Sequence, residues 1–348
     1  MTKYVKIGNF VRIRTGKVDV NNEVEGGEFP FFTCSKNPTR IDIAPYNCEC
    51  VLIAGNGDFH VTYFEGQFNA YQRTYIIESL DKSVLNVRYL FYFFKSYINV
   101  LRNQSIGAVI KYLKLGMLTD AKIPLPPLEE QKRIASILDK ADNLRRLYAQ
   151  RRERTEELLR STFLDMFGDP VTNPKGWEVK KLGDVVNFST GNLNSNAAEE
   201  NGIYPFFTCS RQPFRINSYA FDNKALLLAG NNASADYWVA YYHGKFNAYQ
   251  RTYVITLKNS TDSYRYFQYA LRFRLNELKR FSKGSNTKYL TLGILKPMPF
   301  QVPTAEAQKK FEDIIREYEV ISSQIEKSIQ ISDDFFNSLL QRAFKGEL

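Results

Sequence analysis

The chain has few of the residues that build metal centres and disulfide scaffolds. Its 348 residues include four cysteines and two histidines, His60 and His243, and neither histidine recurs in the internal repeat described below. Four cysteines indicate a reducing, cytoplasmic setting. We expect Cys34 and Cys209 to be small buried apolar side chains. Unpaired histidines argue against a histidine-based catalytic pair or a metal site, so we expect neither catalytic residues nor a metal in this chain.

Several other signals are missing. No apolar run approaches the roughly 18 residues that span a bilayer, and the N-terminus has no apolar core of a signal peptide. A Gly-rich phosphate loop, a dinucleotide fingerprint and the Asn-Pro-Pro-aromatic string of amino-methyltransferases are also absent. Glu178 and Lys180 after Asp169 could be a fragment of a nuclease motif, but the first half has no match for it. We therefore expect no membrane association, and any methyl transfer must be done by another protein.

What the chain does have is an internal repeat. PFFTCS at residues 30–35 returns at 205–210, FNAYQRTY at 68–75 returns at 246–253, and KYL at 111–113 returns at 288–290. The net charge is +10 and the pI is near 9.2, which favours a polyanionic partner. A duplicated basic and aromatic module suggests a reader of a DNA site with two half-sites.

Each copy contains a compact part and a long helix. Short aromatic and β-branched runs broken by Gly and Asn predict strands in residues 1–125 and 176–302, with a helix at 84–102 and at 263–279. Proline-rich segments at 123–127 and 300–303 then block strand continuation. The predicted fold is α+β, with two mixed α/β domains at 1–127 and 169–304 and helices at 128–168 and 305–348.

Both long helices carry the same apolar stripe. Polar residues interrupt the stripe at Arg151 and Thr155 in the first helix and at the matching Ser328 and Ser332 in the second. The most economical packing is an antiparallel coiled coil, in which a helix of roughly 58 Å acts as a spacer. The alternative is that each helix folds back on its own domain. Because the second helix ends where the first repeat begins, the repeat is circular and predicts a pseudo-twofold molecule. The stripe residues are Ile134, Ile137, Ala141, Leu144, Tyr148 and Leu158, and Phe311, Ile314, Tyr318, Ile321, Ile325 and Phe335.

These strings resemble a known family. FFT at 31–33, YQRTY at 71–75, KYL at 111–113 and especially IPLPPLEEQ at 123–131 are similar to the specificity subunits of type I restriction–modification systems. The second copy keeps only part of the last string, Pro303, Glu306 and Gln308. The resemblance implies two target-recognition domains that each read half of a bipartite double-stranded DNA sequence, helices that set the spacing, two methylation subunits with S-adenosylmethionine, and restriction subunits. Specificity chains of some type II systems have a similar plan, and a non-DNA assembly scaffold is the alternative from another class.

The candidate DNA-binding residues fall into matched sets. Gln pairs with adenine and Arg with guanine, so Gln72 and Arg73 are candidate base readers, although their strand-like string puts them on opposite faces and one could be structural. Polar residues in the loop after an aromatic strand suit groove contact or a solvated turn. Lys and Tyr after a Gly-rich segment suit a phosphate clamp or a surface loop. The full set is Thr33, Ser35, Arg40, Gln72, Arg73, Lys111 and Tyr112, with Thr208, Ser210, Arg215, Gln250, Arg251, Lys288 and Tyr289.

The copies differ most at residues 56–66 and 231–244. We expect differences in the bases read to originate there. Because the rest of the two modules agrees well, we expect the half-sites to be nearly inverted copies, with about one helical turn, roughly 34 Å, between them.

Overall fold

The computed structural model describes residues 4–348, so the first three residues of the predicted 1–127 domain lie outside the described part. The chain divides into two compact units, which we call unit 1 (residues 4–150 and 326–348) and unit 2 (residues 151–325). Both boundaries fall inside the two longest helices. Each unit therefore contains one mixed α/β module and half of each long helix.

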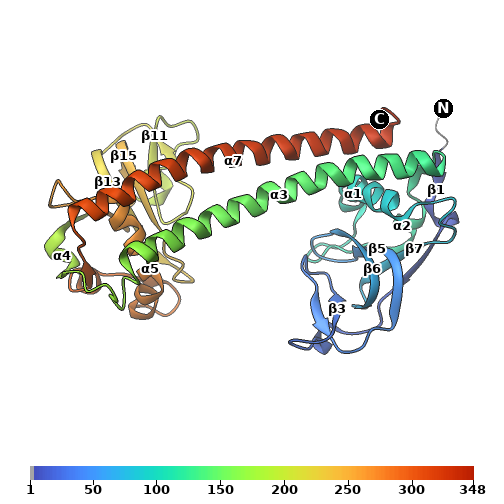
Figure 1. Cartoon of the computed structure of the whole chain (residues 1–348), viewed down its shortest axis with the longest axis horizontal. Helices are drawn as coiled ribbons and strands as arrows, with labels where there is room; N and C mark the ends of the chain where they lie inside the picture. Colours follow the sequence, from blue (N-terminus) through green and yellow to red (C-terminus); the bar gives the residue numbers. More distant parts are fainter. Residues whose placement is uncertain (1–3) are drawn as a thin grey trace. The chain divides into compact units, whose positions relative to one another are not determined.

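Unit 1 is built on a six-stranded sheet in the order β2-β7-β5-β6-β3-β4, antiparallel except between β3 and β6. A separate pair, β1 and β8, joins the start of the module to its end. The elements, shown in Figure 1, are β1 (Tyr4–Lys6), η1 (Ile7–Asn9), β2 (Val11–Thr15), η2 (Val20–Asn22), β3 (Phe29–Phe32), β4 (Thr39–Ile41), β5 (Tyr46–Ala54), β6 (Val61–Ala70), β7 (Thr74–Ser79), α1 (Val87–Gln104), α2 (Leu115–Thr119), β8 (Lys122–Pro124) and α3 (Leu128–Phe167).

Unit 2 repeats this plan with sheet order β10-β16-β13-β15-β11-β12 and the pair β9 and β18. It adds a short ladder between β14 and β17. The elements are β9 (Val179–Lys181), α4 (Leu182–Val185), β10 (Val186–Thr190), η3 (Ser195–Ala197), β11 (Tyr204–Phe207), β12 (Phe214–Ile216), β13 (Phe221–Ala229), β14 (Asn231–Asn232), β15 (Val239–Ala248), β16 (Thr252–Leu257), α5 (Tyr264–Phe281), β17 (Lys288–Tyr289), α6 (Leu292–Leu295), β18 (Pro299–Gln301) and α7 (Ala305–Lys345).

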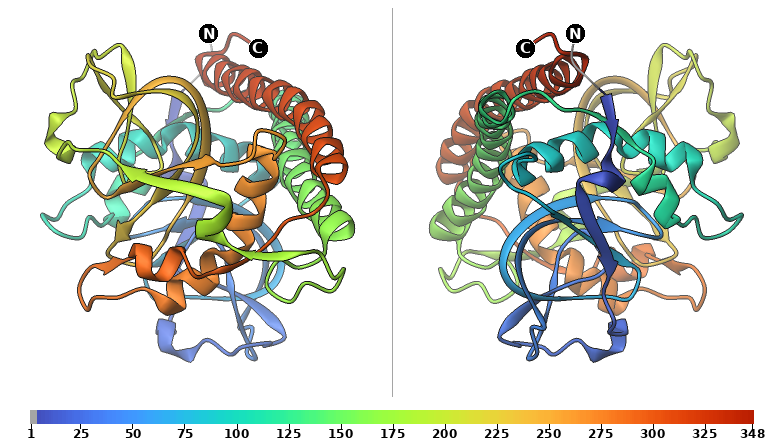
Figure 2. Two further views of the ribbon diagram at one scale, coloured as in Figure 1. Left: turned by 90° about the vertical axis from the view of Figure 1, so that its left-hand side faces the viewer. Right: turned by 90° about the vertical axis from the view of Figure 1, so that its right-hand side faces the viewer.

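The sheet of unit 1 is buried on both faces. Alternation along β5 directs Val51 and Ile53 into one apolar cluster and Cys50 and Leu52 into another, the second of which includes Phe32. The strands curve strongly, as the right-hand view of Figure 2 shows. Burial on both faces explains why β5 reads as a continuous apolar run rather than as an alternating one.

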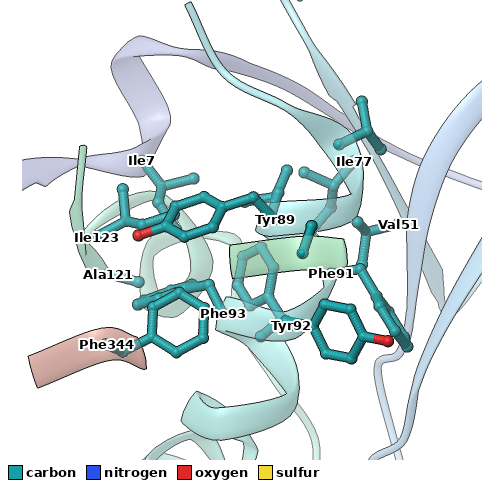
Figure 3. Close-up of a cluster of buried hydrophobic side chains, with 14 of the residues drawn as sticks. Ile7, Val51, Ile77, Tyr89, Phe91, Tyr92, Phe93, Ala121, Ile123 and Phe344 are labelled. Atoms are coloured by element: carbon teal, nitrogen blue, oxygen red, sulfur yellow. The ribbon is translucent and has the colours of Figure 1, made fainter. Parts of the chain in front are cut away.

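Helix α1 lies between the sheet and α3 (Figure 1). Its aromatic residues form the centre of the larger core, shown in Figure 3, and the ring of Phe344 from the end of α7 enters this cluster. The Phe344 ring centroid lies 5.1 Å from that of Tyr89 and 5.6 Å from that of Phe93. Unit 1 therefore requires the last turns of α7 for its core.

The two long helices run antiparallel in both units. In unit 1, Arg133 of α3 donates to the carbonyl of Leu348, and Arg145 of α3 donates to Asp333 of α7. The first half of α3 therefore lies beside the last half of α7. In unit 2, the rings of Phe163 in α3 and Phe311 in α7 lie 5.2 Å apart. This confirms the predicted antiparallel pair of helices.

The predicted stripe is only partly correct. Ile134, Ala141, Phe311 and Ile325 are buried, whereas the stripe residues Leu144, Leu158, Ile321 and Phe335 are exposed. Several buried positions lie one residue further along, at Leu138, Leu159, Ile315 and Phe336. The reason is that each half-helix packs against the module of its unit as well as against the other helix, which rotates and widens the buried face.

A partly buried ion pair joins α1 to α3 in unit 1. Lys95 donates to Asp142 at 3.0 Å, and Arg145 and Arg146 also contact this carboxylate. Burial lowers the pKa of Lys95. Burial alone would raise the pKa of Asp142, but the Lys95, Arg146 and Arg145 charges hold this pKa below its usual value. The Asp142 carboxylate is therefore charged at neutral pH.

A buried glutamine joins each long helix to its module. In unit 1, the Gln131 amide donates to the carbonyls of Val84 and Pro126 and accepts from the backbone N–H of Asn86, each at 2.9 Å. Gln308 has the same role in unit 2, where it accepts from the Ser263 N–H at 2.8 Å and donates to the Pro303 carbonyl at 2.9 Å. These glutamines satisfy backbone groups at the start of α1 and α5 that would otherwise be buried without partners.

None of the helices within residues 4–348 is long and apolar enough to span a membrane.

Replacing Gln131 by leucine is expected to lower the free energy of unfolding by about 3 kcal/mol, because three partly buried backbone groups lose their partners together. Urea unfolding followed by circular dichroism measures this loss. Gln150→Leu, at an exposed position of the same helix, is the matched control and should change the free energy by less than about 0.5 kcal/mol. Equal effects of the two substitutions would contradict the role assigned to Gln131.

Candidate nucleic-acid interface

One end of each sheet gathers three of the candidate segments. In unit 1, β6 and β7 are joined by a tight turn at residues 71–74, closed by a hydrogen bond from the Thr74 N–H to the Tyr71 carbonyl at 2.8 Å. Gln72 and Arg73 are the exposed central residues of this turn. The prediction that they lie in a strand, on opposite faces, is therefore wrong, because a turn projects both side chains from the same tip.

Backbone hydrogen bonds tie this turn to its neighbours. The Arg73 carbonyl accepts from the Gly55 N–H at 2.8 Å, and the Gly55 carbonyl accepts from the Leu113 N–H at 2.8 Å. Two residues further along, the Gly57 N–H donates to the Lys111 carbonyl at 3.1 Å. Residues 72–73 and 111–112 are thus held next to each other through the segment that follows β5.

The approach at Gly55 is too close for any side chain. A Cβ built on Gly55 would lie 2.3 Å from the Arg73 carbonyl oxygen, and one on the matching Gly230 would lie 2.4 Å from that of Arg251. Glycine is thus required at both positions by contact and not by backbone conformation.

The loop after β3 is the third segment. The Tyr71 N–H donates to the Phe32 carbonyl, and the Cys34 thiol lies 3.8 Å from the Arg73 carbonyl oxygen. The matching Cys209 lies 2.7 Å from the side-chain oxygen of Asn231. Both cysteines are partly exposed free thiols, so the expectation that they are buried apolar side chains is not met.

Within this loop the candidates differ. The side chains of Thr33 and Thr208 are buried, and each accepts a hydrogen bond at 3.1 Å from the backbone N–H of Ser35 or Ser210. These hydroxyls stabilise the turn and do not face solvent, so their burial fits neither the expected contact with a DNA groove nor the alternative of a solvated turn. Ser35 and Ser210 are exposed.

Arg40 and Arg215 were expected in the same loop, but the structure places them in strands β4 and β12. Arg40 lies opposite Pro30 and its guanidinium donates to the Glu28 carbonyl at 3.0 Å. Arg215 likewise donates to the Ile203 carbonyl at 3.1 Å. Both are exposed, but they lie beside the start of β3 and β11, away from the end at which the other candidates meet.

In the exposed turn, the glutamine side chain has a hydrogen-bond partner, whereas the arginine side chain has no ion-pair partner among residues 4–348. The Gln72 amide lies 3.3 Å from the carboxylate of Asp19, and Gln250 donates to Asn194 at 2.6 Å. Neither Arg73 nor Arg251 makes an ion pair with any of residues 4–348, and both are exposed. Sequence reasoning missed Asp19 and Asn194, which orient the glutamines, because they lie far away in the chain and in no repeated string.

Lys111 and Tyr112 belong to a small hairpin. Ile106 and Tyr112 exchange two backbone hydrogen bonds, at 3.1 and 2.8 Å, and Lys283 and Tyr289 do the same in unit 2 at 3.0 and 2.9 Å. Lys111 and Tyr289 are exposed, whereas Tyr112 and Lys288 are partly buried. These segments, expected to form a phosphate clamp or a surface loop, are thus closed hairpins of defined geometry.

Tyrosines fix these hairpins to the sheet. The Tyr75 hydroxyl donates to the Leu113 carbonyl at 2.9 Å, and the Tyr253 hydroxyl donates to the Leu290 carbonyl at 3.0 Å. Burial raises the pKa of both tyrosines, against the opposing charge of Arg73 or Arg251. Both hydroxyls therefore stay protonated donors at neutral pH.

The two units thus present matching surfaces, made in unit 1 by the exposed residues of the turn at 72–73, the loop at 34–36 and the hairpin at 106–112. A family model described as the type I restriction modification DNA specificity domain matches the chain twice, at residues 2–157 and 174–332. The chain belongs to this family.

Individual relatives agree with this assignment. The chain is 35% identical over 179 residues to the type I restriction enzyme EcoDI specificity subunit of Escherichia coli, which covers 50% of this chain and 39% of that protein. It is 27% identical over 301 residues to the MjaIX specificity subunit of Methanocaldococcus jannaschii, which covers 75% of this chain and 68% of that protein. The chain thus spans well under half of the first relative and about two thirds of the second.

A solved structure shows the same fold. The S subunit of a type I restriction-modification system from M. genitalium superposes with a TM-score of 0.67 at 17% identity, over 98% of this chain and 96% of that one. The relatives named here are type I specificity subunits, so the comparisons do not favour the type II or scaffold alternatives. For this family, the matching surfaces of the two units are the candidate DNA interface.

Replacing Gly55 by alanine is expected to separate the turn at 71–74 from the hairpin at 106–112, because the added Cβ would collide with the Arg73 carbonyl. Amide hydrogen exchange should become at least tenfold faster in those two segments and stay unchanged in the long helices. Gly116→Ala is the control, since a Cβ there meets nothing closer than 3.9 Å. Unchanged exchange in both segments after Gly55→Ala would contradict this arrangement.

Proposed function

We propose that this chain is the DNA-reading subunit of a type I restriction–modification complex, in which each unit reads one half of a bipartite double-stranded target. The observation that carries the proposal is the recurrence, in both units, of an exposed Gln-Arg turn held beside a basic hairpin. Glutamine and arginine are the side chains that pair bidentately with adenine and guanine in the major groove.

The electrostatics of the surface support this proposal. Arg73, Lys36 and Lys111 are exposed on or beside the three segments in unit 1. The guanidinium of Arg73 makes no ion pair within the described residues, so it is available to a ligand. Cations on such a surface neutralise phosphates and release counterions, which positions the duplex under the base-reading residues.

In this proposal residues 1–127 and 169–304 are the target-recognition domains, and the helices at 128–168 and 305–348 set the spacing of the half-sites. Helix α3 is continuous over 40 residues, roughly 60 Å. The DNA-binding residues proposed are Ser35, Gln72, Arg73, Lys111 and Tyr112 and, in unit 2, Ser210, Gln250, Arg251, Lys288 and Tyr289. Thr33 and Thr208 support the loop, and Arg40 and Arg215 lie at the periphery.

The chemistry belongs to partners. The chain would be a non-catalytic, cytoplasmic subunit that holds no metal or cofactor and docks two methylation subunits, which bind S-adenosylmethionine, and restriction subunits. The likeness of the two units supports half-sites that are nearly inverted copies of each other.

Long-read mapping of methylated adenines tests this function directly. Cells that express the chain with a methylation subunit should show a methylated, interrupted, near-palindromic motif, and cells without the chain should not. Two unrelated half-sites would retain the reader role and remove the near-palindrome. No chain-dependent motif would overturn the proposed function.

Arg73→Ala is expected to weaken binding to the cognate duplex by about 1–3 kcal/mol, because a contact to a base edge is lost. Fluorescence anisotropy at several salt concentrations measures both the affinity and its salt dependence. Arg12→Ala is the charge-matched control, because the exposed Arg12 lies opposite Glu78 at the far end of β7. Equal weakening by both variants would contradict a base contact by Arg73, because it would show that only the loss of one positive charge matters.

A further inference from the structure

The hairpin at the candidate interface is closed by the same pair of backbone hydrogen bonds in both units but carries different side chains. Its second residue is a glycine with positive φ, Gly107 at 115° and Gly284 at 95°. A Cβ there would lie 2.2 Å from the Ile110 carbonyl oxygen in unit 1 and 2.1 Å from that of Thr287 in unit 2. Glycine therefore allows the two arms of each hairpin to come this close.

The tip of the unit 1 hairpin is apolar and exposed. Val109 is 95% exposed, Ile110 is 63% exposed and Ile106 is 39% exposed. At the matching positions unit 2 has the polar residues Asn286, Thr287 and Lys283. Single exposed apolar residues are common on proteins, but three of them within one seven-residue hairpin mark a contact surface.

The position of this hairpin indicates what it contacts. Gly57 binds the Lys111 carbonyl, and the neighbouring Gly55 binds both the Arg73 carbonyl and the Leu113 N–H. The apolar tip is therefore flanked by Lys111 and stands beside the Gln72-Arg73 turn. An apolar tip with cations beside it is complementary to a ligand that carries apolar groups between phosphate groups.

A two-stranded ribbon fits the major groove of B-DNA, and the apolar group exposed there is the 5-methyl group of thymine. We propose that Val109 and Ile110 read thymine by its methyl group in the half-site bound by unit 1, whereas Asn286 and Thr287 read hydrogen-bonding edges at the matching place in unit 2. This inference rests on the proposed function and deepens it. The two units would thus read their half-sites by different chemistry even if the half-sites are nearly inverted copies.

Deoxyuridine, which lacks only the methyl group, is the direct probe. The full-length chain, purified with its methylation partner, is titrated with duplexes that carry the mapped motif and one deoxyuridine in place of one thymine. We expect one or two substitutions in a single half-site to weaken binding about fourfold each, the effect of one buried methyl group. Substitutions in the other half-site should have no effect.

Paired exchanges of the tips assign the effect to the hairpin. Val109→Asn with Ile110→Thr gives unit 1 the tip of unit 2 and should abolish the sensitivity to deoxyuridine. Asn286→Val with Thr287→Ile is the reciprocal exchange and should create sensitivity in the other half-site. All four positions lie on exposed hairpins closed by the same pair of backbone hydrogen bonds, so both variants are expected to fold.

The outcomes separate the two proposals. Sequence-specific binding that ignores deoxyuridine at every position would overturn the methyl contact and leave the proposed function intact. Weakening by the Val109 and Ile110 exchange that does not depend on the methyl group would also overturn it, because it would indicate insertion between bases. Loss of the methylation partner with unchanged DNA affinity would make the hairpin a protein contact. Absence of any sequence-specific binding would refute the proposed function itself.

Discussion

The structure depends on the polar contacts that Gln131 and Gln308 make inside an apolar interface. Each glutamine binds backbone groups from the segment before α1 or α5 and from the proline-rich segment before its long helix. A hydrophobic contact alone would hold these elements together without fixing their angle, whereas several hydrogen bonds from one buried side chain fix it. These hydrogen bonds therefore help to set the direction in which each long helix leaves its module.

The fold was largely predictable from the sequence because the repeat presents the same signals twice. Helices α1 and α5, the proline-rich segments and the long helices all lie where the apolar spacing placed them. The register of the stripe was not predictable at residues such as Leu144 and Phe335. A heptad pattern describes a helix that packs against one other helix. Each half of these helices packs against the other long helix and also against the module of its unit, so its buried face is wider than a heptad predicts.

The candidate site was less accessible from the sequence. The Tyr71–Thr74 turn contains no glycine, proline, asparagine or aspartate, so it carries none of the residues that mark a turn. Its bend comes instead from tertiary hydrogen bonds, such as the one between Arg73 and Gly55. Thr33 was misjudged for a different reason. A polar residue next to a strand is expected to face solvent, but the Thr33 hydroxyl is buried inside its own loop. The turn is held by the distant Gly55, whereas the Thr33 hydroxyl binds the backbone N–H of the nearby Ser35.

The division of the chain into units also has a consequence for biosynthesis. Unit 2 is one uninterrupted segment, residues 151–325, so all of its core has been made before residues 326–348 are added. Unit 1 needs residues 326–348, because Phe336 and Phe344 cover the aromatic face of α1. During translation the module of unit 1 is therefore started before that of unit 2 but completed after it, and the face of α1 that Phe336 and Phe344 cover stays exposed while the ribosome adds residues 151–325. A nonsense mutation between residues 326 and 336 would therefore damage the N-terminal recognition domain and spare the C-terminal one.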